Sequence, residues 1–312
     1  MNFGIRLRKF LQEYCTVDLR SLATWRIVLG CCITLDLLSR MVDLQAHYTD
    51  AGILPRGFIV DLLNNSSFFS LYLGVGNPIS VGILFLIHLA LALAFTFGFR
   101  TRLVTILLFA FEVSLHNRAH ILLSGADTVM RLGLFWSIFV PIGDRWSLDA
   151  KNERPTSHAA IVWALPIFVL QIFAMYFFAA LAKKGDHWHE NYDAVYHALS
   201  HRLFQTPIAA YMIGFPIFLK FVTWIVWWVE LVVPFLLFVP FRIPTFRTIA
   251  VLILIGLQVS FALHLWVDFF PWVSIGLLIA ILPPTFWRFI FSQKLSREKV
   301  PVAGPNRWIL AA

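Results

Sequence analysis

Two adjacent lysines, Lys183 and Lys184, end an apolar stretch in YFFAALAKKGDHWHENY (residues 176–192). A lysine takes up a proton only when it is neutral, so its pKa must first fall from the usual ~10.4. Desolvation at a helix end and a like charge next door both lower that pKa, whereas pairing with Asp186 or Glu190 would keep the amine charged. The simpler role for such lysines is to anchor a membrane span by extending toward the lipid headgroups.

Two other polar sets also stand at the ends of apolar stretches, in SLHNRAH (residues 114–120) and HLWVDFFPW (264–272). Together with the lysines, they form the densest groups of polar side chains that the predicted topology places at the outer face. The candidate residues in these two sets are His116, Asn117, Arg118, His120 and His264.

The histidines also raise the question of a metal site. His187 and His189 are two residues apart and would point to different sides of a helix. We therefore predict no bound metal.

The chain around these residues has 312 residues, of which 59% are hydrophobic and only 13% charged, too few for the surface of a soluble domain of this length. Several continuous apolar runs approach the ~20 residues that cross a bilayer. The composition predicts an all-α, polytopic membrane bundle. It would form one domain (residues 1–290) with a short basic tail (291–312), and membrane lipid would be its first partner.

We predict about eight spans from the apolar runs, and a ninth if residues 206–220 form a separate short span or a re-entrant piece. Residues 42–77 would form an outer connection. The eight predicted spans lie near 20–41, 78–98, 102–117, 121–142, 158–182, 216–241, 246–266 and 269–290.

The distribution of Lys and Arg predicts that both termini are cytoplasmic, because the segments then placed inside hold most of these residues. This bias also accounts for the net charge of +8 without a nucleic-acid partner. It places Lys183 and Lys184 on the outer face, against the usual trend, so the pair calls for a specific reason.

Ionisable residues inside the predicted spans should face a cavity or a partner. Arg26 and Asp36 are ten residues apart, too far to pair, so we expect each to find a partner on another helix. Glu112 is one turn from His116. Asp127 is one turn from Arg131, and these two residues are interpreted either as a local ion pair or as functional residues. His88 and Glu230 are interpreted as hydrogen-bonded packing residues or as functional ones.

The sequence resembles the HTTM family, bacterial membrane proteins that share their transmembrane domain with vitamin K-dependent γ-glutamyl carboxylase. The similarity extends in the expected order over most of the chain. The matching stretches are WRIVLG, DLLSRMVDLQAHYTDAGILPR (36–56), SLHNRAHILLSGADTVMRLGLFWSIFVPIGDRWSLDA (114–150), QIFAMYFFAALAKKGDHW (171–188), WWVELVVPFLLFVPF (227–241) and HLWVDFFPWVSIGLLIAILPPTFW (264–287).

The resemblance implies a role for each candidate residue. In the carboxylase branch, a lysine after a similar segment is the base that deprotonates vitamin K hydroquinone. The equivalent here is Lys183, or Lys184 if the register shifts by one. Asn117 matches the asparagine of an Asn-His pair, but Arg118 stands in place of that histidine, with His116 and His120 beside it. His264 matches a histidine before the last span.

The resemblance therefore implies a quinol-dependent epoxidase or carboxylase-like lyase of the bacterial inner membrane. Reduced vitamin K or a related quinol would be its cofactor, with O2 and CO2 as co-substrates. The carboxylase's large lumenal region has no counterpart in this sequence, so carboxylation of a propeptide-tagged substrate is not implied. The alternatives are a maturation or immunity partner that binds a secreted peptide without redox chemistry, and a transporter, for which the sequence shows no convincing repeat.

Overall fold

The protein is described by a computed structural model that places residues 10–62, 69–151 and 157–291. Apart from Phe291, the predicted tail (291–312) lies outside the described residues. The chain divides into two compact units, each described here by itself. We call residues 23–154 the inserted unit and residues 1–22 with 155–312 the flanking unit.

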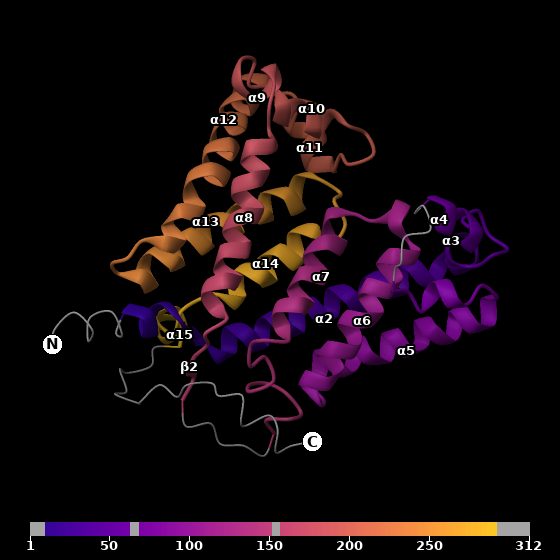
Figure 1. Cartoon of the computed structure of the whole chain (residues 1–312). Coiled ribbons are helices and arrows are strands. Elements are labelled where there is room, and N and C mark those ends of the chain that lie inside the picture. Colours follow the sequence, from indigo (N-terminus) through magenta and orange to yellow (C-terminus); the bar gives the residue numbers. More distant parts are fainter. Residues whose placement is uncertain (1–9, 63–68, 152–156, 292–312) are drawn as a thin grey trace. The chain divides into compact units, whose positions relative to one another are not determined.

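All regular elements described in the inserted unit are helices. Its long helices α5 and α6 lie side by side (Figure 1). It begins within α2, because the boundary between the units falls inside that helix. Its elements are α2 (Leu19–Val42), α3 (Leu44–Tyr48), α4 (Arg56–Leu62), η1 (Tyr72–Gly74), α5 (Pro78–Phe97), α6 (Thr101–Arg118), η2 (His120–Leu122) and α7 (Gly125–Ser137).

The flanking unit contains a two-stranded antiparallel sheet besides its helices. In it, Thr16 of β1 pairs with Ile161 of β2. Helices α8 and α12 run side by side, and α9 packs against the end of α12 (Figure 1). Its elements are β1 (Thr16–Asp18), β2 (Ala159–Ile161), α8 (Leu165–Ala182), α9 (Asp186–His189), α10 (Ala194–Ser200), α11 (Pro207–Met212), α12 (Pro216–Val232), η3 (Val233–Phe238), α13 (Ile243–His264), α14 (Phe270–Ala280) and α15 (Pro284–Ile290).

Five helical segments in the described chain are long and apolar enough to cross a membrane: α2, α5, α8, α12 with η3, and α13. A sixth is added if α14 and α15 are counted as one span bent by 101°. The prediction of a mainly helical membrane protein is confirmed. A count of eight or nine spans is not.

The remaining predicted spans differ from simple crossings for local reasons. The third (102–117) is α6, an 18-residue helix that carries Arg102, Glu112 and Arg118. The fourth (121–142) contains η2 and the 13-residue α7, which is only ~20 Å long against the ~30 Å of a bilayer core. The eighth (269–290) breaks at Pro283, where an unbroken helix cannot continue.

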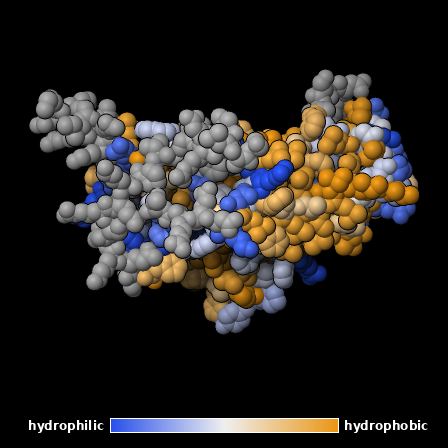
Figure 2. All heavy atoms as spheres, turned by 90° about the horizontal axis from the view of Figure 1, so that it is seen from below, coloured by the Kyte–Doolittle hydropathy of each residue, from blue (hydrophilic) through white to orange (hydrophobic). Residues whose placement is uncertain are grey.

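Large apolar side chains are exposed on the membrane-crossing helices. In α5, only 28% of the most apolar window is buried within the protein, against 61% in α2. Figure 2 shows hydrophobic residues covering a continuous part of the face it presents. An apolar surface of this extent suits lipid rather than water. On α5 the exposed residues are Ile79, Ile83, Leu86, Ile87, Leu93 and Phe97.

Within the inserted unit, α2 packs closely against α7. The buried Trp25 ring lies against Gly133, where an added Cβ would be 2.3 Å from Trp25 Cζ2. Trp25 Nε1 also donates a hydrogen bond of 3.0 Å to Ser137 Oγ. The neighbouring Arg26 donates to the carbonyl oxygens of Ile142 and Arg145, at 2.7 and 3.1 Å, and to that of Thr96 on α5 at 3.4 Å. Its partners are therefore main-chain atoms, one of them on another helix.

Gly133→Ala is therefore expected to destabilise the protein, because the buried indole has no room to move away from the new methyl group. The cost should be about 1–3 kcal/mol, as in other overpacked cores. Thermal unfolding in detergent measures it. The matched control is Gly82→Ala in α5, where nothing lies within 4 Å of the added Cβ. Equal melting temperatures for the two variants would contradict the packing argument.

Candidate functional site

Lys183 stands where α8 ends. It is the C-cap residue of that helix, and its N–H donates to the Ala180 carbonyl at 3.1 Å. Two residues later Gly185 adopts a φ of 91°, a region that favours glycine, and the chain turns into α9. The apolar helix therefore ends in a tight turn that starts at the lysine.

The Lys183 side chain turns back onto α12. Its Nζ forms an ion pair with Glu230 Oε2, and it also lies 3.4 Å from the Ala179 carbonyl oxygen. The Glu230 side chain is 4% exposed and that of Lys183 is 20% exposed, whereas the adjacent Lys184 is exposed. The two lysines therefore occupy different environments, and the carboxylate next to Lys183 is neither Asp186 nor Glu190.

Aromatic side chains and one histidine surround this pair. The Trp188 ring centroid is 5.4 Å from Lys183 Nζ, within cation–π range. His189 Nε2 lies 2.9 Å from the Lys183 carbonyl oxygen, and the His189 ring packs edge-on against Trp227 at 5.0 Å. Trp227 Nε1 in turn donates to the Ala180 carbonyl at 3.2 Å. These contacts fasten α9 and α12 to the end of α8.

A second polar contact lies between α8 and α13. Gln258 Nε2 donates to the Tyr176 hydroxyl at 2.9 Å, and both side chains are buried. Gln258 Oε1 has no hydrogen-bond partner among the described residues. Tyr176 lies on α8, the helix whose C-terminal end carries Lys183.

His264 belongs to the same unit but bonds within its own helix. Its Nδ1 lies 2.8 Å from the Ser260 carbonyl oxygen, and the side chain is half-buried at the end of α13. The main chain beyond it pairs with residues before α11, through a Gln205–Leu265 bridge. In the described structure, the contacts of His264 do not include Lys183.

The other predicted site residues belong to the inserted unit and do not share one environment. Asn117 Nδ2 donates to the Phe69 carbonyl at 2.8 Å, and the buried Arg118 donates to the Leu54 carbonyl at 2.5 Å. Both hold the main chain of the 42–77 connection, while His120 is exposed. Because Lys183 and His264 lie in the other unit, the convergence of all these residues on one site stays a prediction.

His116 is buried in a cluster of charged groups that includes Arg40. Its Nε2 lies 3.0 Å from Glu112 Oε2 and 3.3 Å from Asp127 Oδ1, although neither contact has hydrogen-bond geometry. Arg40 pairs with Asp127 at 2.5 Å and with Asp36 at 2.7 Å. Glu112 and His116, one turn apart on α6, are therefore in contact.

Two predicted pairings in this cluster are corrected. Asp36 was expected to find its partner on another helix, but it pairs with Arg40, one turn away on α2. Asp127 was expected to pair with Arg131, but its carboxylate contacts Arg40 and His116 and accepts a hydrogen bond from the Ser124 N–H at the start of α7. The D-x-x-x-R spacing of Asp36 and Arg40 was a sequence signal that could have revealed the pair.

The cluster continues to His88 on α5. His88 Nε2 is 3.8 Å from Glu112 Oε1, and its Nδ1 is 3.2 Å from the Tyr72 hydroxyl, so it is a buried histidine with a partner. Three carboxylates face one guanidinium here, which leaves two net negative charges when both histidines are neutral. The Arg40 charge is therefore the main compensation for buried acid in this unit.

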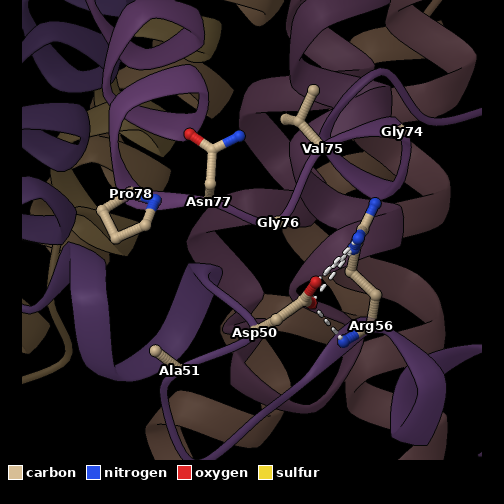
Figure 3. Close-up of a pocket in the computed structure, with 8 residues that line it drawn as sticks. All are labelled: Asp50, Ala51, Arg56, Gly74, Val75, Gly76, Asn77 and Pro78. Carbon is tan, nitrogen blue, oxygen red and sulfur yellow. Dashed lines mark hydrogen bonds and ion pairs between the residues drawn. The ribbon is translucent and has the colours of Figure 1, made fainter.

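A shallow hollow of about 480 Å³ lies elsewhere in the inserted unit, lined by residues 50, 51, 56 and 74–78 (Figure 3). Within it Arg56 faces Asp50 and pairs with it at 2.7 Å. Hydrogen bonds from Arg56 hold the pKa of Asp50 below its usual value. None of the predicted site residues lines this hollow.

Loss of Arg40 should unfold the inserted unit more readily, because it would leave Asp36 and Asp127 buried without their cation. Arg40→Gln is expected to cost about 3–5 kcal/mol, as for other broken buried pairs. Arg131→Gln is the matched control, since Arg131 is not the partner of Asp127. Chemical or thermal unfolding in detergent gives the comparison. If both variants lost similar amounts of stability, the result would support a local Asp127–Arg131 pair instead.

Comparison with known proteins gives one family match. A sequence model of the HTTM domain matches residues 14–287, which is most of the chain. No curated protein and no solved structure matches the chain.

Proposed function

Because the chain belongs to the HTTM family, we propose that this integral membrane protein is a quinol-dependent epoxidase or carboxylase-like enzyme with Lys183 as its base. In this proposal the protein lies in the bacterial inner membrane with both termini cytoplasmic, and Lys183 acts at the outer face. Its substrates would be a lipid-soluble quinol and O2, with CO2 as a further co-substrate.

The observation that supports this proposal most directly is the pairing of Lys183 with a buried carboxylate. A lysine that only anchors a span would extend to the headgroups, as the exposed Lys184 can. Lys183 instead packs back against α12 beside Glu230 and Trp188. The two adjacent lysines thus differ in burial and pairing, as expected if Lys183 acts as a base and Lys184 anchors the helix end.

The carboxylate does not rule out a base, because the two groups can share a proton. In an apolar environment an ion pair loses much of its advantage over the neutral acid and amine. If Glu230 holds the proton, Nζ of Lys183 is free to take another from a bound hydroxyl group. The charge of the pair then rises from zero to +1, which balances the negative charge left behind by the departing proton.

The surrounding residues suit an aromatic hydroxyl compound. Trp188 and Trp227 offer flat apolar surfaces beside the pair, and Gln258 Oε1 is a buried acceptor without a partner. A bound quinol, oxidised by O2, would supply the strong base that removes an inert C–H proton. By the family resemblance, His116, His120 and His264 would orient or stabilise the oxyanion, and Asn117 and Arg118 occupy the positions of the family's Asn-His pair.

The test is quinone epoxide formation by purified protein supplied with a reduced naphthoquinone and O2. Lys183→Ala should lower the rate at least ~100-fold, the usual contribution of a general base. Lys184→Ala is the matched control and should remain close to the wild-type rate. Glu230→Gln keeps the shape of the side chain but removes the proton acceptor, so it should also lower the rate.

Equal losses from the two lysine variants would contradict the assignment of Lys183. No epoxide from folded wild-type protein would favour the second candidate, a maturation or immunity partner that binds a secreted peptide without redox chemistry. In that case the Lys183–Glu230 pair would serve only to hold α8 against α12. Melting temperatures of all variants separate lost folding from lost chemistry.

A further inference from the structure

A separate cluster of ligating side chains follows Lys183 in the flanking unit: His187, Asp193 and His197. One ligand atom of each lies within 4.8 Å of those of the other two. His187 Nδ1 is 2.7 Å from Asp193 Oδ1, and His197 Nε2 is 3.4 Å from Asp193 Oδ2. The two imidazole rings lie 4.7 Å apart.

The turn between α9 and α10 brings these residues together. His187 lies on α9, the chain reverses at Tyr192, whose φ is 55°, and Asp193 precedes α10. Asp193 and His197 are four residues apart and therefore share one face of the chain at the start of α10. His187 and His197 are ten residues apart and lie on different helices, so no short sequence motif reveals the site.

His189, which lies near the cluster in the sequence, makes other contacts. His189 contacts the Lys183 carbonyl and the Trp227 ring, and so it is not part of the cluster. The two clustered imidazoles are 61% and 55% exposed, while the carboxylate between them is 28% exposed. An ion from solution could therefore reach the carboxylate and both ring nitrogens without opening the fold.

We propose that His187, Asp193 and His197 bind one divalent first-row transition-metal ion, with Zn²⁺ as the representative case. Two imidazoles and one carboxylate suit zinc, nickel or copper, whereas Ca²⁺ and Mg²⁺ prefer oxygen ligands. With bonds of about 2.0–2.1 Å in a tetrahedron, neighbouring ligand atoms are about 3.3 Å apart. In this structure His187 lies 2.7 Å from one Asp193 oxygen and His197 lies 3.4 Å from the other, and one set of three ligand atoms lies within 4.8 Å, so side-chain rotations would bring the three atoms to that spacing.

Three protein ligands leave the fourth position of a tetrahedral ion to water. The ion would also link α9 to α10 and so tighten the segment that carries Trp188 and His189. This site uses none of the atoms assigned to the base, and it does not depend on the proposed quinol chemistry.

The test uses the whole protein in detergent, purified without a histidine tag and stripped of metal with a chelator. Titration with Zn²⁺ by calorimetry should show one site per chain, and Co²⁺ should give the visible absorption of a tetrahedral complex. His187→Ala and His197→Ala should each weaken binding by at least the 10- to 100-fold that losing an outer partner costs. His201→Ala, an exposed histidine outside the cluster, should leave it unchanged.

Ca²⁺ should not compete for the site, and Zn²⁺ should raise the melting temperature of the wild type but not that of the His187 variant. No stoichiometric Zn²⁺ binding, or equal binding by wild type and both cluster variants, would overturn the proposal. Because the readouts are metal binding and melting temperature, a failure here is distinct from a failure to form quinone epoxide.

Discussion

A charge removed from water needs a partner, and this requirement determines where the chemistry of this chain can lie. In the flanking unit the requirement joins Lys183 on α8 to Glu230 on α12. In the inserted unit it makes Arg40 bridge Asp36 and Asp127. The positions of α8 against α12 and of α2 against α7 therefore follow from charge pairing as well as from apolar packing.

The sequence predicted best those features that depend on a single segment. Apolar length identified α2, α5, α8, α12 and α13, because a stretch that must match the bilayer carries its own signal. It failed on α7, which is too short to cross, and at Pro283, where a continuous apolar run hides a bent backbone. Hydropathy averages over a window and does not register helix breaks or neighbouring helices.

Pairing depends on contacts between segments, and here the sequence predicted less. It selected Lys183 only through the family resemblance, because nothing local distinguishes it from Lys184. The difference comes from Glu230, which lies 47 residues later and was interpreted on its own. Likewise, the local spacing of Asp127 and Arg131 suggested a pair, but a cation on another helix is better placed. For His187 the sequence offered only His189 as a second ligand, whereas the fold brings it beside Asp193 and His197 on the next helix.

The small sheet in the flanking unit has a consequence for the order of biosynthesis. Residues 16–18 cannot pair until residues 159–161 have been made, and the whole inserted unit is encoded between them. During translation, β1 therefore has no strand to pair with while more than a hundred residues are made after it. Strand β1 therefore completes its sheet only after the chain of the inserted unit has been made.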